Sequence, residues 1–395
     1  MLVKKRFKKS NVCFRRLLHA VGQGAFFTEQ FFVDGKSDLN VIYDCGSLSK
    51  KGILDVEINR TFAYDKTKPI HVDVLFISHL DKDHISGIPT LKKLKCIDDK
   101  TIVILPFSYP LLLFYLLPVI QMDNETKSAI QALFKSNAKI LGVDYTEGIG
   151  DLSSSREIIL KDNKDEFDNY STINNAVFKY ERIWNYIPFM NVNDSSVWRN
   201  FFNELKSRDL DLDKLKNAQY VEDNLDKLKK IYSTVTSKSS GGVTPINICS
   251  LQLLSFKNKD IKHEYVLWHN AYLSPKKGVL SCLFSGDTVI DIVFVNSMQS
   301  ISNYLNSKIE LLQIPHHGRE SCYDKKIYGG NNFDAAFVNY DSTHKKNSYI
   351  NTIETDMNTQ KKDFFHITEL YYSDLIVNLF VWIPPVSLVP CTNGA

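Results

Sequence analysis

Short runs of β-branched and aromatic residues, broken by glycine or aspartate, fill the first hundred positions of the chain. Apolar runs of this length between turn residues predict β-strands. The runs are NVCFRRLLHAV, FFTEQFFVDG, LNVIYDCG and VDVLFIS. After the breaking segment SSGGVTP at 239–245, strands are predicted again at INICSLQLLSF, LSCLFSGD, IELLQIP, FDAAFVNYD and LIVNLFVW.

From about 122 to 240 the pattern changes to charged segments whose apolar residues recur with a helical period. Three segments predict helices: DNETKSAIQALFKSN, DSSVWRNFFNELKSR and LDKLKNAQYVEDNLDKLKKIY, the last with Leu225, Leu228 and Tyr232 on one face. The order of elements therefore predicts an α/β chain in three parts. They are a first strand region at 1–121, a helical insertion at 122–240, and a second strand region at 241–395.

The apolar segment at 102–120, IVILPFSYPLLLFYLLPVI, reaches the length that spans a membrane. Three prolines divide it, and a continuous helix tolerates interior prolines poorly. We interpret TIVILP as a buried strand and the rest as apolar packing under the insertion. We expect no stable membrane span, although surface contact with a membrane stays open.

The composition is that of a globular protein with a large core, with 395 residues, 44% hydrophobic and 24% charged. The net charge of +3 is small, but KKRFKK at 4–9 and FRR at 14–16 concentrate positive charge near the N-terminus. This cluster is either a solvated edge or a patch that attracts phosphate. Seven cysteines without CxxC spacing, behind a charged N-terminus, indicate reduced thiols in the cytoplasm.

Several of the predicted apolar strands stop at a histidine or an aspartate. VDVLFIS runs into His79, LSCLFSG into Asp287, IELLQIP into His316 and His317, and DAAFVNYDST into His344. Strand ends of α/β proteins are where ligands collect. Brought together, these endings would form one cluster of imidazoles and carboxylates.

The spacing in SHLDKDH is suited to two metal ions. His79 and Asp81 are two apart, so they point the same way from an extended strand end. Asp83 and His84 follow on the turn that opens the next helix. His79 with Asp81 can serve one ion, Asp83 with His84 the other, and Asp287 can bridge them. The alternative is a polar loop in which Asp81 or Asp83 only caps the helix.

This set of motifs resembles the metallo-β-lactamase fold, whose hallmark is H-x-H-x-D-H after a strand and a later G-D. It is most similar to the hydrolase domain of the ComEC DNA-uptake proteins, with SHxDxDHxGG. Further blocks agree in order: HAVGQGAFF with DVGQGD, VIYDCGS with lIDgG, INICSL with NnxSlV, LFSGD with LLTGD, LLQIPHHGRES with vLkvpHHGS, and FFHITELYYSDLIVNL with a closing hairpin. The resemblance covers about 12–105 and 245–382.

The resemblance implies an αββα sandwich whose two halves are 1–121 and 241–395, with a helical insertion at 122–240 as lid or docking element. It also implies two divalent cations. The ligands that it implies are His79, Asp81, Asp83, His84, Asp287, His317 and His344. Because Asp81 stands where most of the superfamily has histidine, Mn²⁺ or Mg²⁺ is favoured, with Zn²⁺ allowed.

Three departures from the family pattern stand out. Ser86 replaces a glycine, Arg319 follows HHG in place of serine, and the segment around His344 lacks the family's GHP. His344 is therefore interpreted either as a ligand or as a proton donor.

The expected chemistry is metal-assisted hydrolysis of a phosphodiester. Asp83 would orient the attacking water, and His317 or His344 would protonate the leaving oxygen, while His316 and Arg319 would contact the substrate. The resemblance implies DNA as the substrate, with a protein partner on the insertion. Two alternatives stay open: a small-molecule phosphodiesterase, for example for cyclic nucleotides, and a non-catalytic binding module. A groove of lysine and arginine would favour the nuclease, and an enclosed pocket the small-molecule enzyme.

Overall fold

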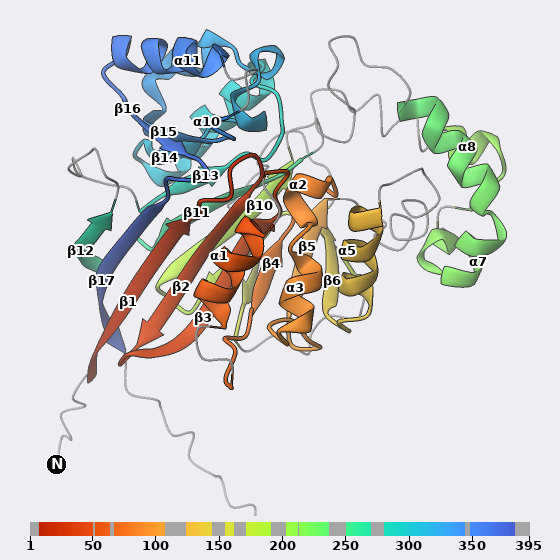
Figure 1. Ribbon diagram of the computed structural model, residues 1–395, viewed down its shortest axis with the longest axis horizontal. Coiled ribbons are helices and arrows are strands. Elements are labelled where there is room, and N and C mark those ends of the chain that lie inside the picture. The colour runs from red at the N-terminus through yellow and green to blue at the C-terminus, as the bar shows by residue number, and fades with distance from the viewer. Residues whose placement is uncertain are drawn as a thin grey trace, which may run out of the picture.

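The computed structural model of the protein describes eleven stretches of the chain. They are residues 8–49, 52–63, 67–106, 124–143, 155–161, 171–190, 203–211, 213–236, 250–269, 280–343 and 348–383. Two β-sheets lie face to face between two layers of helices (Figure 1).

The first sheet has nine strands within these stretches, in the order β12-β17-β1-β2-β3-β4-β5-β6-β8. Pairing is antiparallel from β12 to β3 and parallel from β3 to β8. Its strands are β1 Lys8–Leu18, β2 Phe26–Val33, β3 Lys36–Cys45, β4 Val74–Phe76, β5 Ile102–Pro106, β6 Lys139–Val143, β8 Ser171–Ile173, β12 Lys262–His269 and β17 Ser373–Ile383.

The second sheet has eight described strands in the order β16-β15-β14-β13-β11-β10-β9-β7, with β13 to β16 parallel. They are β7 Arg156–Ile159, β9 Ala176–Tyr180, β10 Trp184–Met190, β11 Leu251–Lys257, β13 Cys282–Phe284, β14 Ile309–Gln313, β15 Phe333–Asn339 and β16 Asp363–Ile367. Aromatic rings join the sheets, as where Phe14 stacks on Trp184 at 4.1 Å between ring centroids.

Helices cover the outer face of each sheet, which explains why most of the strands are apolar on both faces. The helices α1 Ile53–Phe62, α3 Ile88–Lys93 and α5 Asn124–Phe134 lie over the first sheet (Figure 1). The helices α10 Ile292–Leu305 and α11 Ser348–Thr359 pack on the second. The short α2 Lys82–Ile85 lies at the upper edge. The predicted α/β class and the αββα order are confirmed.

The expectation that 122–240 is a helical insertion is wrong for much of its length. Five strands lie between 139 and 190; β6 and β8 extend the first sheet, and β7, β9 and β10 extend the second. The described helices of the rest are α5, a short helical stretch at 203–207, α7 Ala218–Asp223 and α8 Leu225–Thr236, beside a 3₁₀ turn at Asp213–Lys216. The apolar and aromatic run WNYIPFM indicates a strand at β10, and all seven of its residues are buried. Because charged residues surround this run, the region was predicted to be helical.

Of the apolar segment at 102–120, the predicted strand is confirmed as β5, and residues 107–120 lie outside the described stretches. No helix among the described residues combines the length and the apolar character that crossing a membrane requires.

Candidate metal centre

The candidate ligands lie where parallel strands of both sheets end. His79 follows β4, and the next residues lead into α2, which carries Asp83 and His84. Asp287 follows β13 and His317 follows β14. Carboxyl ends of parallel strands share one edge of a sheet, and the face-to-face packing of the sheets brings the two edges together. Segments more than two hundred residues apart thus form one site.

Two groups of side chains have ligand atoms within 4.8 Å of one another. One group is Asp83, His84, Asp287 and His317, and the other is His79, Asp81 and Asp83. Every ligand expected from the sequence that lies in a described stretch is in one of these groups. His344 lies outside the described residues, so its role stays a prediction.

Asp83 belongs to both groups, and Asp287 of the first group also faces His79 of the second. The Oδ1 of Asp287 is 3.3 Å from His84 Nε2 and 3.8 Å from His317 Nε2. Its Oδ2 is 3.8 Å from His79 Nε2 and 3.6 Å from His316 Nδ1. Because each oxygen faces different imidazoles, the carboxylate has the placement that a bridging ligand requires.

The remaining carboxylates flank this centre. Asp81 Oδ2 lies 3.6 Å from His79 Nε2, and its side chain is 43% exposed, so it marks the open side of the site. Asp83 is buried, with Oδ2 3.2 Å from His317 Nε2 and 4.0 Å from His84 Nε2. The exposure of Asp81 leaves a path for a ligand or an ion from solvent.

Three buried atoms in this site have no hydrogen-bond partner: His79 Nε2, His84 Nε2 and Asp287 Oδ1. An orphaned buried polar atom costs about 1–3 kcal/mol, so three together need an explanation. The opposite nitrogens are held, since His79 Nδ1 lies 3.0 Å from Ser78 Oγ and His84 Nδ1 is likewise engaged. Imidazoles fixed through Nδ1 with Nε2 pointing at carboxylates fit a divalent cation.

Asp44 supports the site and was not among the residues predicted from the sequence. It ends β3 at a left-handed φ of 55° and accepts hydrogen bonds from Ser78 N at 2.6 Å and Ser78 Oγ at 2.7 Å. Its Oδ2 lies 2.8 Å from His84 Nδ1. The sequence signal for Asp44 is an aspartate near the end of the apolar strand in VIYDCG. The same pattern identified Asp287.

The two adjacent histidines of the HHG segment have different surroundings. His316, His317 and Gly318 have φ angles of 50°, 54° and 72°, so three consecutive residues have left-handed backbone. The two imidazole rings lie 6.4 Å apart between centroids and nearly perpendicular to each other. His317 Nδ1 is 2.9 Å from the main-chain oxygen of Asn339, to which it can donate while Nε2 faces the carboxylates. His316 Nε2 instead accepts from Arg319 Nη1 at 3.3 Å. These contacts favour His317 as the ligand.

The charges in the cluster shift one another's protonation. Burial raises the pKa of Asp83, but the charge of His84 and the hydrogen bond from His317 outweigh it and lower the pKa to about 2. Burial also opposes the charged form of His84, yet Asp287 and Asp44 hold its pKa well above the ordinary value. Without metal, ionised Asp83 therefore lies beside a protonated His84.

No family model matches this chain, and no curated protein matches it. Among solved structures, the chain is similar to the metallo-beta-lactamase fold protein YhfI from Bacillus subtilis. The two are 8% identical over 91% of this chain and 98% of that chain, with a TM-score of 0.37. The layers and the strand order define the class: an αββα sandwich with a His–Asp cluster at the shared edge of its sheets.

Proposed function

We propose that this chain is a metal-dependent phosphodiesterase of the metallo-β-lactamase type that cleaves nucleic acid. The observation that carries the proposal is the convergence of three buried ligand atoms without hydrogen-bond partners, on His79 and His84 of one segment and on the distant Asp287. The resemblance of the surrounding motifs to the ComEC-type hydrolase domain supports the choice of a phosphodiester.

The donor set divides into two places for cations. His79 and Asp81 would hold one ion, and Asp83, His84 and His317 the other, with Asp287 between them. Three carboxylates with three imidazoles form an oxygen-rich set, which favours Mn²⁺ or Mg²⁺ while allowing Zn²⁺. If these residues held two cations, the ions would supply a hydroxide at neutral pH and polarise the phosphoryl group.

The side chains at the rim would position the substrate and move the proton. Arg319 lies beside His316 on the exposed side of the HHG turn and can place two N–H groups against a phosphate oxygen. Because His317 Nε2 faces Asp83, His317 serves better as a ligand than as a proton donor. His316 Nε2 accepts from Arg319 and its Nδ1 faces Asp287, so protonation of the leaving oxygen is assigned to His344.

The basic N-terminal cluster does not line this edge within the described residues. Lys8 begins β1 and Leu18 ends it, so ten residue steps, or about 33 Å of strand, separate them. The loop after Leu18 reaches the site, where Ala25 N donates to Asp83 O at 2.9 Å. The two arginines of FRR are ion-paired with Asp374 and Glu29. Nucleic acid at the site would therefore rely on Arg319 and the cations rather than on this cluster.

A second candidate substrate is a small nucleotide phosphodiester. A pocket of about 490 Å³ begins at Tyr340, the residue after the Asn339 that holds His317. A pocket of this size can hold a small ligand. Cleavage assays separate the two substrates directly.

The test uses the full chain, stripped with chelator and reloaded with Mn²⁺, Mg²⁺ or Zn²⁺. Metal content is measured by mass spectrometry, and hydrolysis is followed on labelled single- and double-stranded DNA, cyclic nucleotides and methyl p-nitrophenyl phosphate. Asp287→Asn is expected to lose bound metal and hydrolysis together. Asp334→Asn, at an exposed ion pair with Lys308, is the matched control and keeps both. Stoichiometric metal without hydrolysis of any phosphodiester would favour the non-catalytic binding module.

A further inference from the structure

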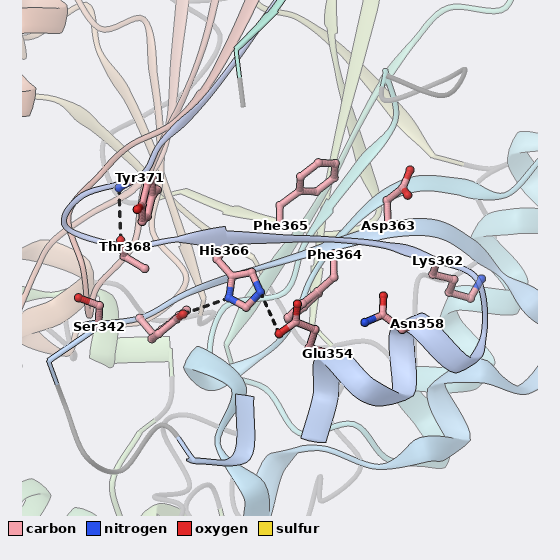
Figure 2. Close-up of a pocket in the computed structure, with 11 residues that line it drawn as sticks. Ser342, Glu354, Asn358, Lys362, Asp363, Phe364, Phe365, His366, Thr368 and Tyr371 are labelled. Carbon is pink, nitrogen blue, oxygen red and sulfur yellow. Dashed lines mark hydrogen bonds and ion pairs between the residues drawn. The ribbon is translucent and has the colours of Figure 1, made fainter. Parts of the chain in front are cut away.

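The pocket of about 490 Å³ is a groove along β16, the last described strand of the second sheet (Figure 2). Side chains from both sides of the strand line it. Figure 2 shows Phe364 and His366 on one side of β16 and Asp363 and Phe365 on the other. The groove therefore lies beside the strand, along the edge that no described strand covers.

The pairing of β16 with β15 fixes which main-chain groups point into this groove. The register places Asn339 opposite Ile367, and Tyr340 N donates to Ile367 O at 3.0 Å. In a parallel pair, a residue that bonds to the neighbouring strand turns both its N–H and its C=O toward that strand, and the next residue turns away. Ile367 therefore faces β15, whereas Phe364 and His366 turn their main-chain groups toward the groove.

The open part of the edge has two defined ends. At one end Lys362 N donates to Met357 O at 3.0 Å, and at the other Thr368 N donates to Tyr371 O at 3.0 Å. The ends are six residues apart, or about 20 Å of strand. Between them, the groove-facing N–H and C=O groups have no hydrogen-bond partner among the described residues. A row of unpaired main-chain groups on an edge strand is a template for another strand.

The walls of the groove carry negative charge. Glu354 of α11 and Asp363 of β16 both line it, and neither has a lysine or arginine partner within the described stretches. The lysine in the wall, Lys362, has its ammonium 2.9 Å from Asn331 Oδ1 and also donates to the main-chain oxygen of Phe333. This lysine is therefore held away from the two carboxylates and leaves their charge uncompensated.

This charge distinguishes between two possible occupants of the edge. A second copy of the chain would bring its own Glu354 and Asp363 to the groove and set like charges against each other. A basic peptide in extended conformation would compensate both carboxylates. Alternate side chains of a strand point to opposite sides, and Figure 2 shows Glu354 and Asp363 on opposite sides of β16.

We propose that β16 and α11 form a docking groove for an extended, basic segment of a partner protein, which joins the second sheet as an added strand. The segment pairs its main chain with Phe364 and His366 over about five or six residues. Its lysine or arginine side chains reach Glu354 on one side and Asp363 on the other. In this mode of recognition, main-chain hydrogen bonds supply affinity and side chains supply specificity. The docking role does not depend on the reaction at the metal centre.

The first test is fluorescence anisotropy of the full chain with labelled hexapeptides. The probe alternates lysine with valine, and it is compared with a glutamate–valine peptide and with a fully N-methylated lysine–valine peptide. The glutamate peptide is expected to bind about tenfold more weakly or worse, because its charge repels the groove. The N-methylated peptide keeps the charge but has no main-chain donors, and a similar loss is expected.

The second test separates main-chain pairing from side-chain contact on the protein. His366→Pro removes a groove-facing N–H, and proline is tolerated on an edge strand where the N–H points outward. His366→Ala removes the imidazole and keeps the N–H, so it is the matched control. The proline variant is expected to lose peptide binding about tenfold or more, and the alanine variant to retain it. Circular dichroism checks that both variants are folded.

A third variant tests the charge and remains informative if the proline variant does not fold. Glu354→Gln combined with Asp363→Asn is expected to abolish the preference for the lysine peptide over the glutamate peptide. Asp334→Asn, a surface carboxylate that is not in the groove wall, keeps the preference.

Three results would overturn the docking groove as proposed. The first is the absence of binding by the lysine peptide at about 1 mM. The second is equal binding of the three peptides, which would show that neither charge nor main-chain pairing contributes. The third is a dimer in sedimentation velocity that His366→Pro dissociates and His366→Ala keeps, because a second copy of the chain would then occupy the edge.

Discussion

The carboxylate of Asp44 lies 2.8 Å from Nδ1 of His84, and both side chains are fully buried. This contact fixes the imidazole so that Nε2 points at Asp287. A carboxylate behind a ligating histidine orients the ring and raises its basicity. Asp44 therefore supports the site by orienting His84, although Asp44 is not itself a proposed ligand.

Asp44→Asn is expected to weaken metal binding by about 10–100-fold, because an amide cannot hold the imidazole as a carboxylate does. The measurement is competition with a chromophoric chelator, followed by metal content after dialysis. Asp334→Asn provides the comparison for a surface carboxylate. Unchanged affinity in Asp44→Asn would show that the contact has no part in the metal centre.

Gly318→Ala is expected to destabilise the fold more than Gly35→Ala does. Both glycines are left-handed, with φ of 72° and 77°, so both variants carry the conformational cost of about 1–2 kcal/mol. A Cβ at Gly318 would lie 2.5 Å from Ile350 Cδ1, whereas nothing lies within 4 Å of one at Gly35. Overpacking adds about 1–3 kcal/mol. Urea denaturation of the two variants measures the difference, and equal losses would contradict the packing argument.

Metal affinity is expected to rise with pH through and above neutrality. The pKa values of His84 and His317 are raised because nearby carboxylates outweigh burial, and that of His84 lies well above its ordinary value, so His84 carries a proton at neutral pH. A protonated imidazole cannot ligate, and binding must release its proton. Affinity should therefore increase about tenfold per pH unit for each proton displaced, up to the raised pKa values. Titration calorimetry in two buffers of different ionisation heat counts the protons. Binding without proton release would exclude His84 as a ligand.

The metal-free chain is expected to have its stability optimum in mild acid. Asp83 has a lowered pKa of about 2, so its contribution is present above its ordinary value near 3.8 and is lost as the pH falls toward 2. His84 has a raised pKa, so its contribution is complete below about 6.5 and is lost as the pH rises through the raised value. Thermal unfolding in chelator across pH measures this window. Added metal should move the optimum to higher pH.

Glu29→Gln is expected to destabilise the fold by about 3–5 kcal/mol, because it leaves a buried guanidinium without its counter-charge. Arg16 Nε lies 2.7 Å from Glu29 Oε1, and both side chains are almost fully buried between the sheets. Replacement of both residues, as Arg16→Met with Glu29→Leu, should cost less than the single change. Chemical denaturation of the wild type and the two variants tests this order, and a double variant that loses more stability than Glu29→Gln would argue against coupling of the pair.

The sequence by itself indicated the candidate ligands and most of the strands near the site. An apolar run followed by histidine or aspartate is a local pattern, and the structure places His79 and Asp287 just after strands β4 and β13, as this pattern predicts. Likewise, the spacing in SHLDKDH indicated two groups of ligands. Both inferences depend only on residues that are close together in the sequence, so they can be made without knowledge of the fold.

Only the tertiary structure decided which atoms meet. The selection of His317 over His316 depends on left-handed backbone and on Asn339, which is 22 residues away. The strands at 139–190 join two different sheets, and β12 and β17 cross to the first, because strand pairing depends on distant partners. The hydrophobic period of a segment predicts which of its side chains are buried. Strand pairing and side-chain contacts depend instead on packing between segments far apart in the chain.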